Sequence, residues 1–210
     1  MKHAADRDLL RRDMRARRRA LSEETRAQAT SSFASVVSRA RLLRPGMRVA
    51  AYLRHGSEAD PLAIVKLARR RGCSIYLPVI ANYRRAQMEF VRYDEGRKLR
   101  TNRFGILEPV RVAHTRIAVR QLDLVFLPLL AIDDEGSRLG SGLGFYDRRL
   151  QHLRAGRQWR RPVLIGVAYE FQRVAHLMPE HWDVPLDGIV TESSYYPLNG
   201  SRGKARDAQS

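Results

Sequence analysis

The hydrophobic pattern at the start of the chain predicts two consecutive helices. The first spans residues 6–20. Its apolar stripe is formed by Leu10, Met14 and Leu21, which fall within about 40° of one another at 100° per residue. Ser22 is a suitable N-cap for the second helix, because its hydroxyl can accept a hydrogen bond from a free backbone amide. We expect the stripe to pack on the core.

Three arginines border this stripe. Arg7, Arg11 and Arg18 lie to one side of it, about 60–100° from Leu10 by the same count. If the stripe faces the core, these side chains stand at its edge, where a cleft can use their charge. A solvated basic face is the alternative interpretation.

From residue 48 onwards, short apolar runs alternate with helical segments, which is typical of an α/β fold with a largely parallel sheet. A helix is expected from Pro61 to Arg71, since proline favours the first helical turn and Gly72 can end the helix. A second, short helix is predicted over residues 145–153. The predicted strands are 48–53, 74–79, 88–93, 122–129, 162–167 and 188–190.

Length and composition agree with one domain. The chain has 210 residues and is 44% hydrophobic, enough for one sizeable core. We expect a single domain over 1–197 and a disordered polar tail over 198–210. No apolar run is long enough to span a membrane, and residues 1–20 lack the apolar stretch of a secretory signal. The single cysteine, Cys73, cannot form an internal disulfide, so we expect a cytoplasmic protein without a membrane partner.

The net charge of +17 is the most unusual property of the composition. One interpretation is a nucleic-acid partner, and another is an arginine-rich but solvated surface. A third is that the excess charge serves an anionic small ligand. The arginines are scattered along the chain as well as clustered near its start, so we expect no specific nucleic-acid partner.

A glycine-rich segment over residues 138–147 carries most of the chemical information. Its three alternate glycines remove side chains, so that backbone amides can approach a ligand closely. Arg138 offers a forked donor for phosphate, and Asp147 offers a hard oxygen ligand for Mg²⁺. Phe145 and Tyr146 supply flat surfaces for a ring. The spacing matches neither the G-x-G-x-x-G pattern nor a loop closed by Gly-Lys-Ser/Thr.

Together with other blocks, this segment resembles the signature of the 5-formyltetrahydrofolate cyclo-ligase family. The blocks are in the family's order and cover about residues 7–196. The chain departs from the family pattern at Leu129 and Ile132, at Phe145 where tyrosine is usual, and at Arg7 where lysine is common. The matching blocks are 7–22, 57–60, 102–109, 127–133, 136–147, 181–187 and 190–192.

The resemblance implies a fold and a reaction. The fold is a three-layer α/β/α domain of the kind shared with ribose-5-phosphate isomerase and CoA-transferase-like domains. The reaction is the ATP- and Mg²⁺-dependent conversion of 5-formyltetrahydrofolate to 5,10-methenyltetrahydrofolate, with release of ADP and phosphate. ATP phosphorylates the formyl oxygen, the nitrogen at position 10 closes the ring, and phosphate departs. We expect a monomer whose partners are small molecules.

The resemblance also implies roles for individual residues. Arg138 and Tyr146 are the implied catalytic residues, and Asp147 and Asp183 the implied Mg²⁺ ligands. A turn before Pro185 is the alternative role for Asp183, and a solvated loop position the alternative for Glu58. The implied ATP-binding residues are Arg7, Arg11, Arg138, Leu139, Gly140, Ser141, Gly142, Leu143, Gly144, Phe145 and Tyr146. The implied substrate-binding residues are Glu58, Ser141, Gly142, Leu143, Gly144 and Phe145.

Two other functions remain open from the sequence. The related folds include sugar-phosphate and acyl-transfer enzymes. The positive charge leaves a basic RNA-binding α/β module as an alternative from a different class.

Overall fold

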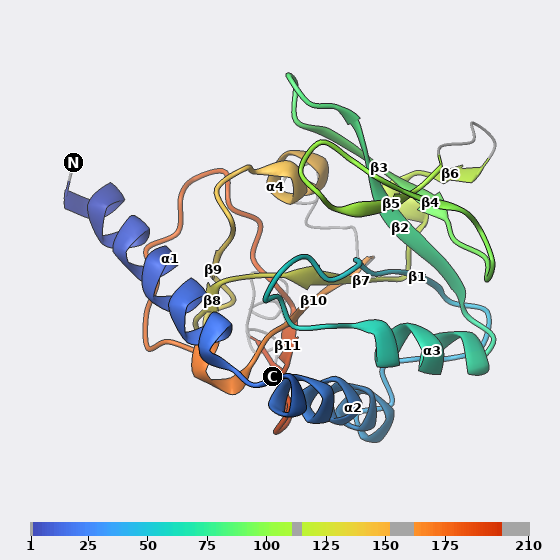
Figure 1. Ribbon diagram of the computed structural model, residues 1–210, viewed down its shortest axis with the longest axis horizontal. Coiled ribbons are helices and arrows are strands. Elements are labelled where there is room, and N and C mark those ends of the chain that lie inside the picture. The colour runs from blue at the N-terminus through green and yellow to red at the C-terminus, as the bar shows by residue number, and fades with distance from the viewer. Residues whose placement is uncertain (1, 111–114, 152–161, 199–210) are drawn as a thin grey trace, which may run out of the picture.

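The computed structural model describes residues 2–110, 115–151 and 162–198, with side chains from residue 6 onwards. Eight strands form one sheet in the order β12-β11-β10-β7-β1-β2-β3-β6 (Figure 1). The five central strands, β11 to β2 in that order, are parallel, and the strands at both edges are antiparallel. The bounds are β1 Arg48–Ala50, β2 Ser74–Asn82, β3 Gln87–Arg92, β6 Arg116–Ile117, β7 Leu124–Pro128, β10 Val163–Val167, β11 Gly188–Val190 and β12 Tyr195–Pro197.

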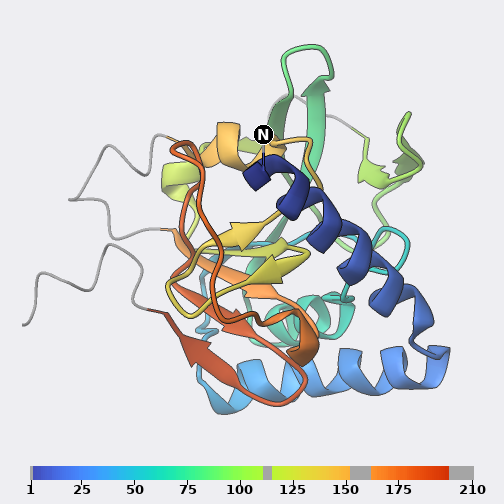
Figure 2. The ribbon, with the colours of Figure 1, turned by 90° about the vertical axis from the view of Figure 1, so that its left-hand side faces the viewer.

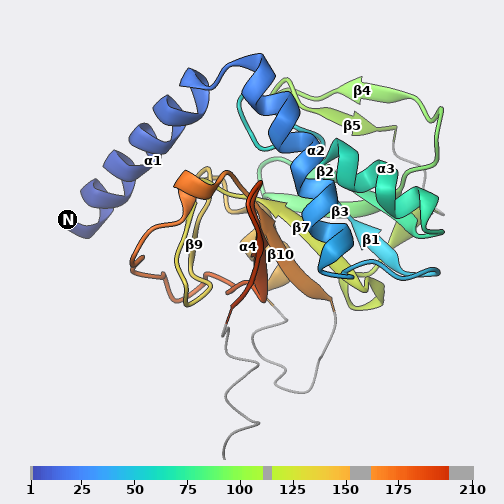
Figure 3. The same ribbon diagram turned by 90° about the horizontal axis from the view of Figure 1, so that it is seen from below.

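Helices cover both faces of this sheet. α2 (Glu23–Arg39) and α3 (Leu62–Arg70) lie together on one face, as Figure 3 shows from below. α4 (Phe145–Leu150) lies on the other face, where it contacts β3 (Figure 1). The prediction of an α/β domain with a mostly parallel sheet and helices on both sides is therefore confirmed.

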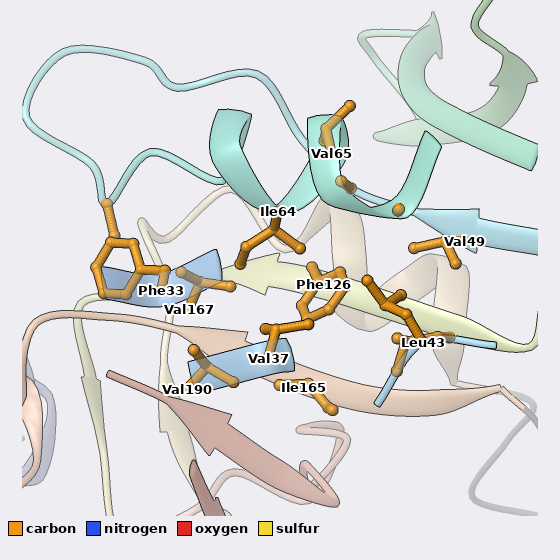
Figure 4. Packing of buried hydrophobic residues seen from close by; sticks show 14 of the residues in the cluster. Phe33, Val37, Leu43, Val49, Ile64, Val65, Phe126, Ile165, Val167 and Val190 are labelled. Carbon is orange, nitrogen blue, oxygen red and sulfur yellow. The ribbon is translucent and has the colours of Figure 1, made fainter. Parts of the chain in front are cut away.

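The main core lies between the sheet and the helix pair. Phe33 and Val37 of α2 and Ile64 of α3 are almost completely buried, and they pack against Phe126 of β7 (Figure 4). Fully burying each such side chain stabilises the fold by about 1.5–3 kcal/mol. The predicted cap is present, since the Thr25 amide donates to the Ser22 Oγ at 3.1 Å.

The order of the parallel strands fixes where a ligand can bind. The chain goes from β1 outwards to β2, and then returns to the other side of β1 to form β7, β10 and β11. The strand order therefore reverses between β1 and β7. In open α/β sheets, a crevice forms outside the carboxyl ends of the strands at this kind of switch point.

Two hairpins and the first helix stand around those carboxyl ends. β4 (Leu99–Thr101) and β5 (Leu107–Pro109) form one hairpin, and β8 (Ala131–Ile132) and β9 (Arg138–Leu139) form the other. α1 (Lys2–Ala20) packs through the buried Met14 against the β8–β9 hairpin (Figures 1 and 2). Leu10 joins this contact and Leu21 packs on the main core, as the predicted stripe requires.

Several predicted boundaries were wrong. β1 ends at Ala50 instead of residue 53, because its residue pairs with β2 and β7 end there. α1 begins at Lys2, earlier than the predicted residue 6, and α4 ends at Leu150. β12 was not predicted, since it has only three residues and pairs along the edge of the sheet. The predicted disordered tail, apart from Leu198, lies outside the described residues. None of the helices in the described part of the chain is long and apolar enough to cross a membrane.

Replacing Gly136 with alanine should lower the free energy of unfolding by at least about 3 kcal/mol, through a strained backbone and a close contact. Gly136 has φ +85°, and an added Cβ would lie 2.6 Å from the carbonyl oxygen of Leu186. Gly46→Ala is the matched control, because Gly46 has φ +79° with nothing within 4 Å of the added Cβ. Denaturant titration should show a loss of only about 1 kcal/mol for the control. Equal losses would show that the contact with Leu186 is unimportant.

Candidate active site

A cavity of about 320 Å³ lies at the carboxyl ends of β1, β2 and β7, within the size range of small-molecule sites. Its walls come from α1, the glycine-rich segment, the β4–β5 hairpin and the segment around Asp183. The lining residues are Arg7, Arg11, Arg15, Arg18, Tyr52, Leu53, His55, Glu58, Leu77, Pro78, Ile80, Met88, Asn102, Phe104, Ile106, Leu107, Glu108, Pro128, Leu129, Leu130, Arg138, Gly140, Ser141, Gly142, Leu143, Gly144, Phe145, Tyr146, Asp147, Glu180, Trp182 and Asp183.

One wall of the cavity is strongly basic. Four arginines of α1 line it, at positions 7, 11, 15 and 18, which a helix places on one face. Arg11 Nε donates to the carbonyl oxygen of Gly140 at 3.2 Å, and Arg15 Nη2 donates to that of Ser141 at 3.0 Å. α1 is thereby tied to the glycine-rich segment. Such a concentration of guanidinium groups attracts anions, phosphates above all.

The glycine-rich segment forms the adjoining wall. Gly142 has φ +101° and Gly144, the residue before α4, has φ +66°. Both conformations favour glycine. An added Cβ at Gly140 or Gly142 would meet no atom within 4 Å, so the backbone here is open to a ligand. The side chain of Leu139, in contrast, is buried against Met14 and lies in the core instead of the cavity.

Arg138 joins two parts of the site that are distant in sequence. Its side chain is 5% exposed and donates hydrogen bonds to Asp147 Oδ1 and to the carbonyl oxygen of Val184. The Val184 amide in turn lies 3.5 Å from Asp147 Oδ1. The arginine therefore holds α4 against the segment that carries Asp183.

Asp183 and Asp147 line the same cavity, although they are 36 positions apart. Asp183 Oδ2 accepts hydrogen bonds from the Glu180 amide at 2.9 Å and from Arg7 Nη2 at 3.4 Å. Each carboxylate is thus balanced by an arginine. Asp187, the next carboxylate along the chain, instead accepts a hydrogen bond from the Leu164 amide at 2.7 Å and does not line the cavity.

This donor set fits Mg²⁺ that arrives with a nucleotide. Among the described residues, no group of three or more histidine, cysteine, aspartate or glutamate side chains is placed to hold a metal ion. Mg²⁺ commonly takes one or two carboxylates together with phosphate oxygens and water, so two aspartates beside a basic wall are chemically sufficient.

The carboxylate of Glu58 stands at the inner end of the basic wall. Its Oε2 accepts a hydrogen bond from the His55 amide at 3.1 Å. Burial raises the pKa of Glu58, and the His55 amide and the charge of Arg18 oppose that rise. Burial also raises the pKa of Tyr146, with a further contribution from the charge of Glu58. The Tyr146 hydroxyl therefore keeps its proton at neutral pH and can donate a hydrogen bond.

An aromatic wall lies on the side of the β4–β5 hairpin. Phe104 packs edge-to-face on Phe145, with ring centroids 6.2 Å apart, and on Tyr83, with centroids 5.4 Å apart. The buried Glu108 fixes this hairpin by accepting hydrogen bonds from the Ile80 amide at 3.1 Å and from Arg100 Nη2 at 2.9 Å. The cavity thus combines a basic wall with a flat apolar one, as a ligand with phosphates and a ring would require.

The structure brings together all the predicted site residues except the side chain of Leu139. Arg15 and Tyr52 were missed as lining residues, whereas Arg18 was expected at the edge of a possible cleft without a stated role; no role was assigned to the block 102–109. The spacing of Arg7, Arg11 and Arg15 at every fourth position was the signal that could have identified Arg15. Tyr52 carried no such signal, because it was expected inside a strand.

Comparisons with known proteins identify the family. Residues 3–192 match the model of the 5-formyltetrahydrofolate cyclo-ligase family. The 5-formyltetrahydrofolate cyclo-ligase of Escherichia coli K12 is 32% identical over 183 residues, which cover 87% of this chain and 98% of that protein. The corresponding Haemophilus influenzae protein is 35% identical over 147 residues, or 70% of this chain and 76% of that one.

Solved structures agree with this assignment. The Aquifex aeolicus 5,10-methenyltetrahydrofolate synthetase superposes with a TM-score of 0.76 at 28% identity, covering 97% of this chain and 95% of that one. The Mycoplasma pneumoniae synthetase, at 22% identity, has the same fold with a TM-score of 0.67, covering 89% of this chain and 99% of that one. The chain described here is therefore a member of the 5-formyltetrahydrofolate cyclo-ligase family.

Proposed function

We propose that the cavity binds ATP and 5-formyltetrahydrofolate next to each other and that this protein converts the folate to 5,10-methenyltetrahydrofolate, releasing ADP and phosphate. The main support for the proposal is that one cavity has both a basic wall and an aromatic wall. Arginines, an open glycine-rich backbone and two carboxylates stand on one side, and an aromatic cluster stands on the other. Family membership supplies the reaction.

The nucleotide belongs on the basic side. Arg7 and Arg11 would hold its phosphates, together with Arg138 and the amides of residues 140–146. Asp147 and Asp183 would hold Mg²⁺, which supplies neutralisation of the phosphate charge when it is bound. In the free protein these aspartates are paired with Arg138 and Arg7, so binding of the Mg²⁺–nucleotide complex exchanges partners within a group of charges that is already in place.

The folate belongs on the aromatic side. Its flat ring system would lie near Phe104 and Phe145, with Glu58 accepting hydrogen bonds from its polar edge. The chemistry needs no enzyme nucleophile, because the formyl oxygen attacks the γ-phosphorus of ATP and then leaves as part of phosphate. The residues must position two substrates and stabilise charge. Tyr146, which keeps its proton, would orient the formyl oxygen through a hydrogen bond.

Turnover provides the first test of this proposal. Purified protein with Mg²⁺ and ATP should release one phosphate for each molecule of 5-formyltetrahydrofolate consumed, and none when the folate is omitted. Phosphate release that does not depend on the folate would show an ATPase instead. Ribose 5-phosphate should not be turned over, whereas its conversion without ATP would favour the sugar-phosphate alternative.

Binding of ATP should change the fluorescence of Trp182, which lies at the cavity rim beside Asp183 and is 52% exposed. The chain has two tryptophans, so Trp159→Phe leaves Trp182 as the only one and should retain the response. Trp182→Phe should lose it while turnover continues. A titration in which both variants respond alike would place the nucleotide elsewhere.

Measuring RNA binding at increasing salt concentration tests the RNA-binding alternative, since phosphate-driven binding weakens steeply with ionic strength. We expect only weak RNA association, lost near physiological salt. Tight, sequence-selective binding at physiological salt would instead favour an RNA-binding protein. We propose that the functional unit is a monomer. We also propose that the enzyme acts in the cytoplasm. Light scattering of the purified protein checks the oligomeric state.

A further inference from the structure

Arg18 is a buried cation in the wall of the cavity. The residue is 7% exposed, although it carries a charge and lines the site. Among the described residues, no carboxylate forms an ion pair with it within 4.0 Å. Within the part of the chain that the structure describes, its Nε is buried without a hydrogen-bond partner, and its Nη1 donates to the carbonyl oxygen of Leu129 at 3.3 Å. This guanidinium group is therefore incompletely satisfied in the free protein.

The fold does not need the charge of Arg18 for its own hydrogen bonding. The Leu129 carbonyl also accepts a hydrogen bond from Gln172 Nε2 at 2.9 Å, so it keeps a partner if Arg18 is replaced. Burial lowers the pKa of Arg18, which means that the protein interior disfavours its charged form. Unpaired buried charges are destabilising, and proteins keep such features mainly at functional sites.

The surroundings of Arg18 indicate which ligand the charge serves. The titratable groups that face it are Glu58, Tyr52, Tyr169 and Arg15. Arg15, one helical turn earlier, bonds to the carbonyl oxygen of Ser141 in the glycine-rich segment. Arg18 thus stands between the segment assigned to the nucleotide and the glutamate assigned to the folate.

Resting on the function proposed above, we propose that Arg18 is a catalytic residue that donates hydrogen bonds to the phosphoryl group while it passes from ATP to the formyl oxygen. In that step the bond between the γ-phosphorus and the β,γ-bridging oxygen breaks, and a bond from the γ-phosphorus to the formyl oxygen forms. ADP leaves with the electron pair of the broken bond. Arg18 stays protonated and transfers nothing.

The burial of Arg18 indicates that its ligand is the transferring phosphoryl group and not the glutamate tail of the folate. A tail must extend from the ring towards solvent, whereas Arg18 lies beside Leu129, immediately after the end of β7 on the cavity floor. The transferring phosphoryl group carries negative charge at the junction of the two substrates, where an enclosed guanidinium interacts with it most strongly.

Replacement by methionine tests the proposal, because methionine keeps much of the length and removes the charge. Arg18→Met should lower kcat by about a hundredfold or more, the effect of losing one donor to a transition-state oxygen, while KM for ATP changes by less than about fivefold. The melting temperature of the free protein should stay equal or rise. Arg18→Lys should recover part of kcat, since it restores the charge without the fork.

Arg12→Met is the matched control, because Arg12 is an exposed arginine on the same helix outside the cavity. It should leave kcat and KM unchanged. The proposal is overturned if Arg18→Met keeps kcat and raises KM more for folates with longer glutamate tails, or if it lowers the melting temperature as a structural residue would. If the wild-type protein makes no product, the proposed reaction is wrong, and the role of Arg18 in phosphoryl transfer is wrong with it. A higher melting temperature of Arg18→Met would in that case show only that the buried charge serves another anion.

Discussion

Replacing Asp183 with asparagine lowers turnover by at least about a hundredfold and leaves the free protein folded. The substitution keeps the shape of the side chain, and its amide oxygen can still accept the hydrogen bond from the Glu180 backbone. What is lost is a negative charge in a cavity where Mg²⁺ and a triphosphate must meet. A hundredfold loss corresponds to about 2.7 kcal/mol of transition-state stabilisation, within the range for one electrostatic contact in an active site.

Magnesium titrations of the variants separate this role from a structural one. Asp147→Asn should behave like Asp183→Asn, and both should need more Mg²⁺ for half-maximal turnover. Asp134→Asn is the control, since Asp134 is 73% exposed in its side chain and pairs with Arg173 outside the cavity. Wild-type turnover and Mg²⁺ dependence in Asp183→Asn would defeat the assignment and leave Asp183 as a turn residue before Pro185. Asp187 could not replace it, because it is not among the residues that line the cavity.

Replacing Arg138 with lysine lowers turnover by about a thousandfold or more and also lowers stability, an effect at the upper end for a single charged contact. Arg138 donates to Asp147 and to the Val184 carbonyl at the same time. A lysine ammonium is a point charge and cannot reproduce the fork. One of the two acceptors is then left without its partner in a largely buried position. Urea denaturation should show a loss of about 2–4 kcal/mol.

A double-mutant cycle checks that Arg138 and Asp147 act as one unit. Arg138→Lys combined with Asp147→Asn should lose far less activity than the two single losses multiplied together, because the second change acts on a pair already broken. Arg148→Lys, at an exposed position in α4, is the control and should retain wild-type activity and stability. Losses that multiply independently would show that the two residues serve separate purposes.

Elements with strong local signals could be predicted from the sequence. The Ser22 cap and the segment between Pro61 and Gly72 define α2 and α3 through residue chemistry that acts within a few positions. The central parallel strands are continuous apolar runs because helices cover both of their faces. The glycine-rich segment identified the site for the same local reason, since alternate glycines are informative without tertiary contacts.

The remaining features depend on contacts between distant residues. From the sequence, Arg7 was expected to bind phosphate and Asp183 to bind a metal, as separate roles, and only the fold shows that they pair with each other. The ring of Phe145 packs against Phe104 of the β4–β5 hairpin. This contact could not be predicted, because the strands of that hairpin have three residues each and are too short to show a periodic pattern. Arg18 was expected at the border of the helix stripe, but its burial, and its lack of a carboxylate partner in the described part of the chain, arise from packing by other segments.

Under the proposed function, this cavity couples ATP cleavage to closure of the folate ring. Absorbance spectroscopy of purified protein with Mg²⁺ and 5-formyltetrahydrofolate tests it most directly, because the methenyl product has a chromophore that the substrate lacks. We predict that the chromophore appears when ATP is added and does not appear without ATP. If well-folded protein forms no chromophore with ATP present, or forms it equally without ATP, the cavity does not couple the two reactions.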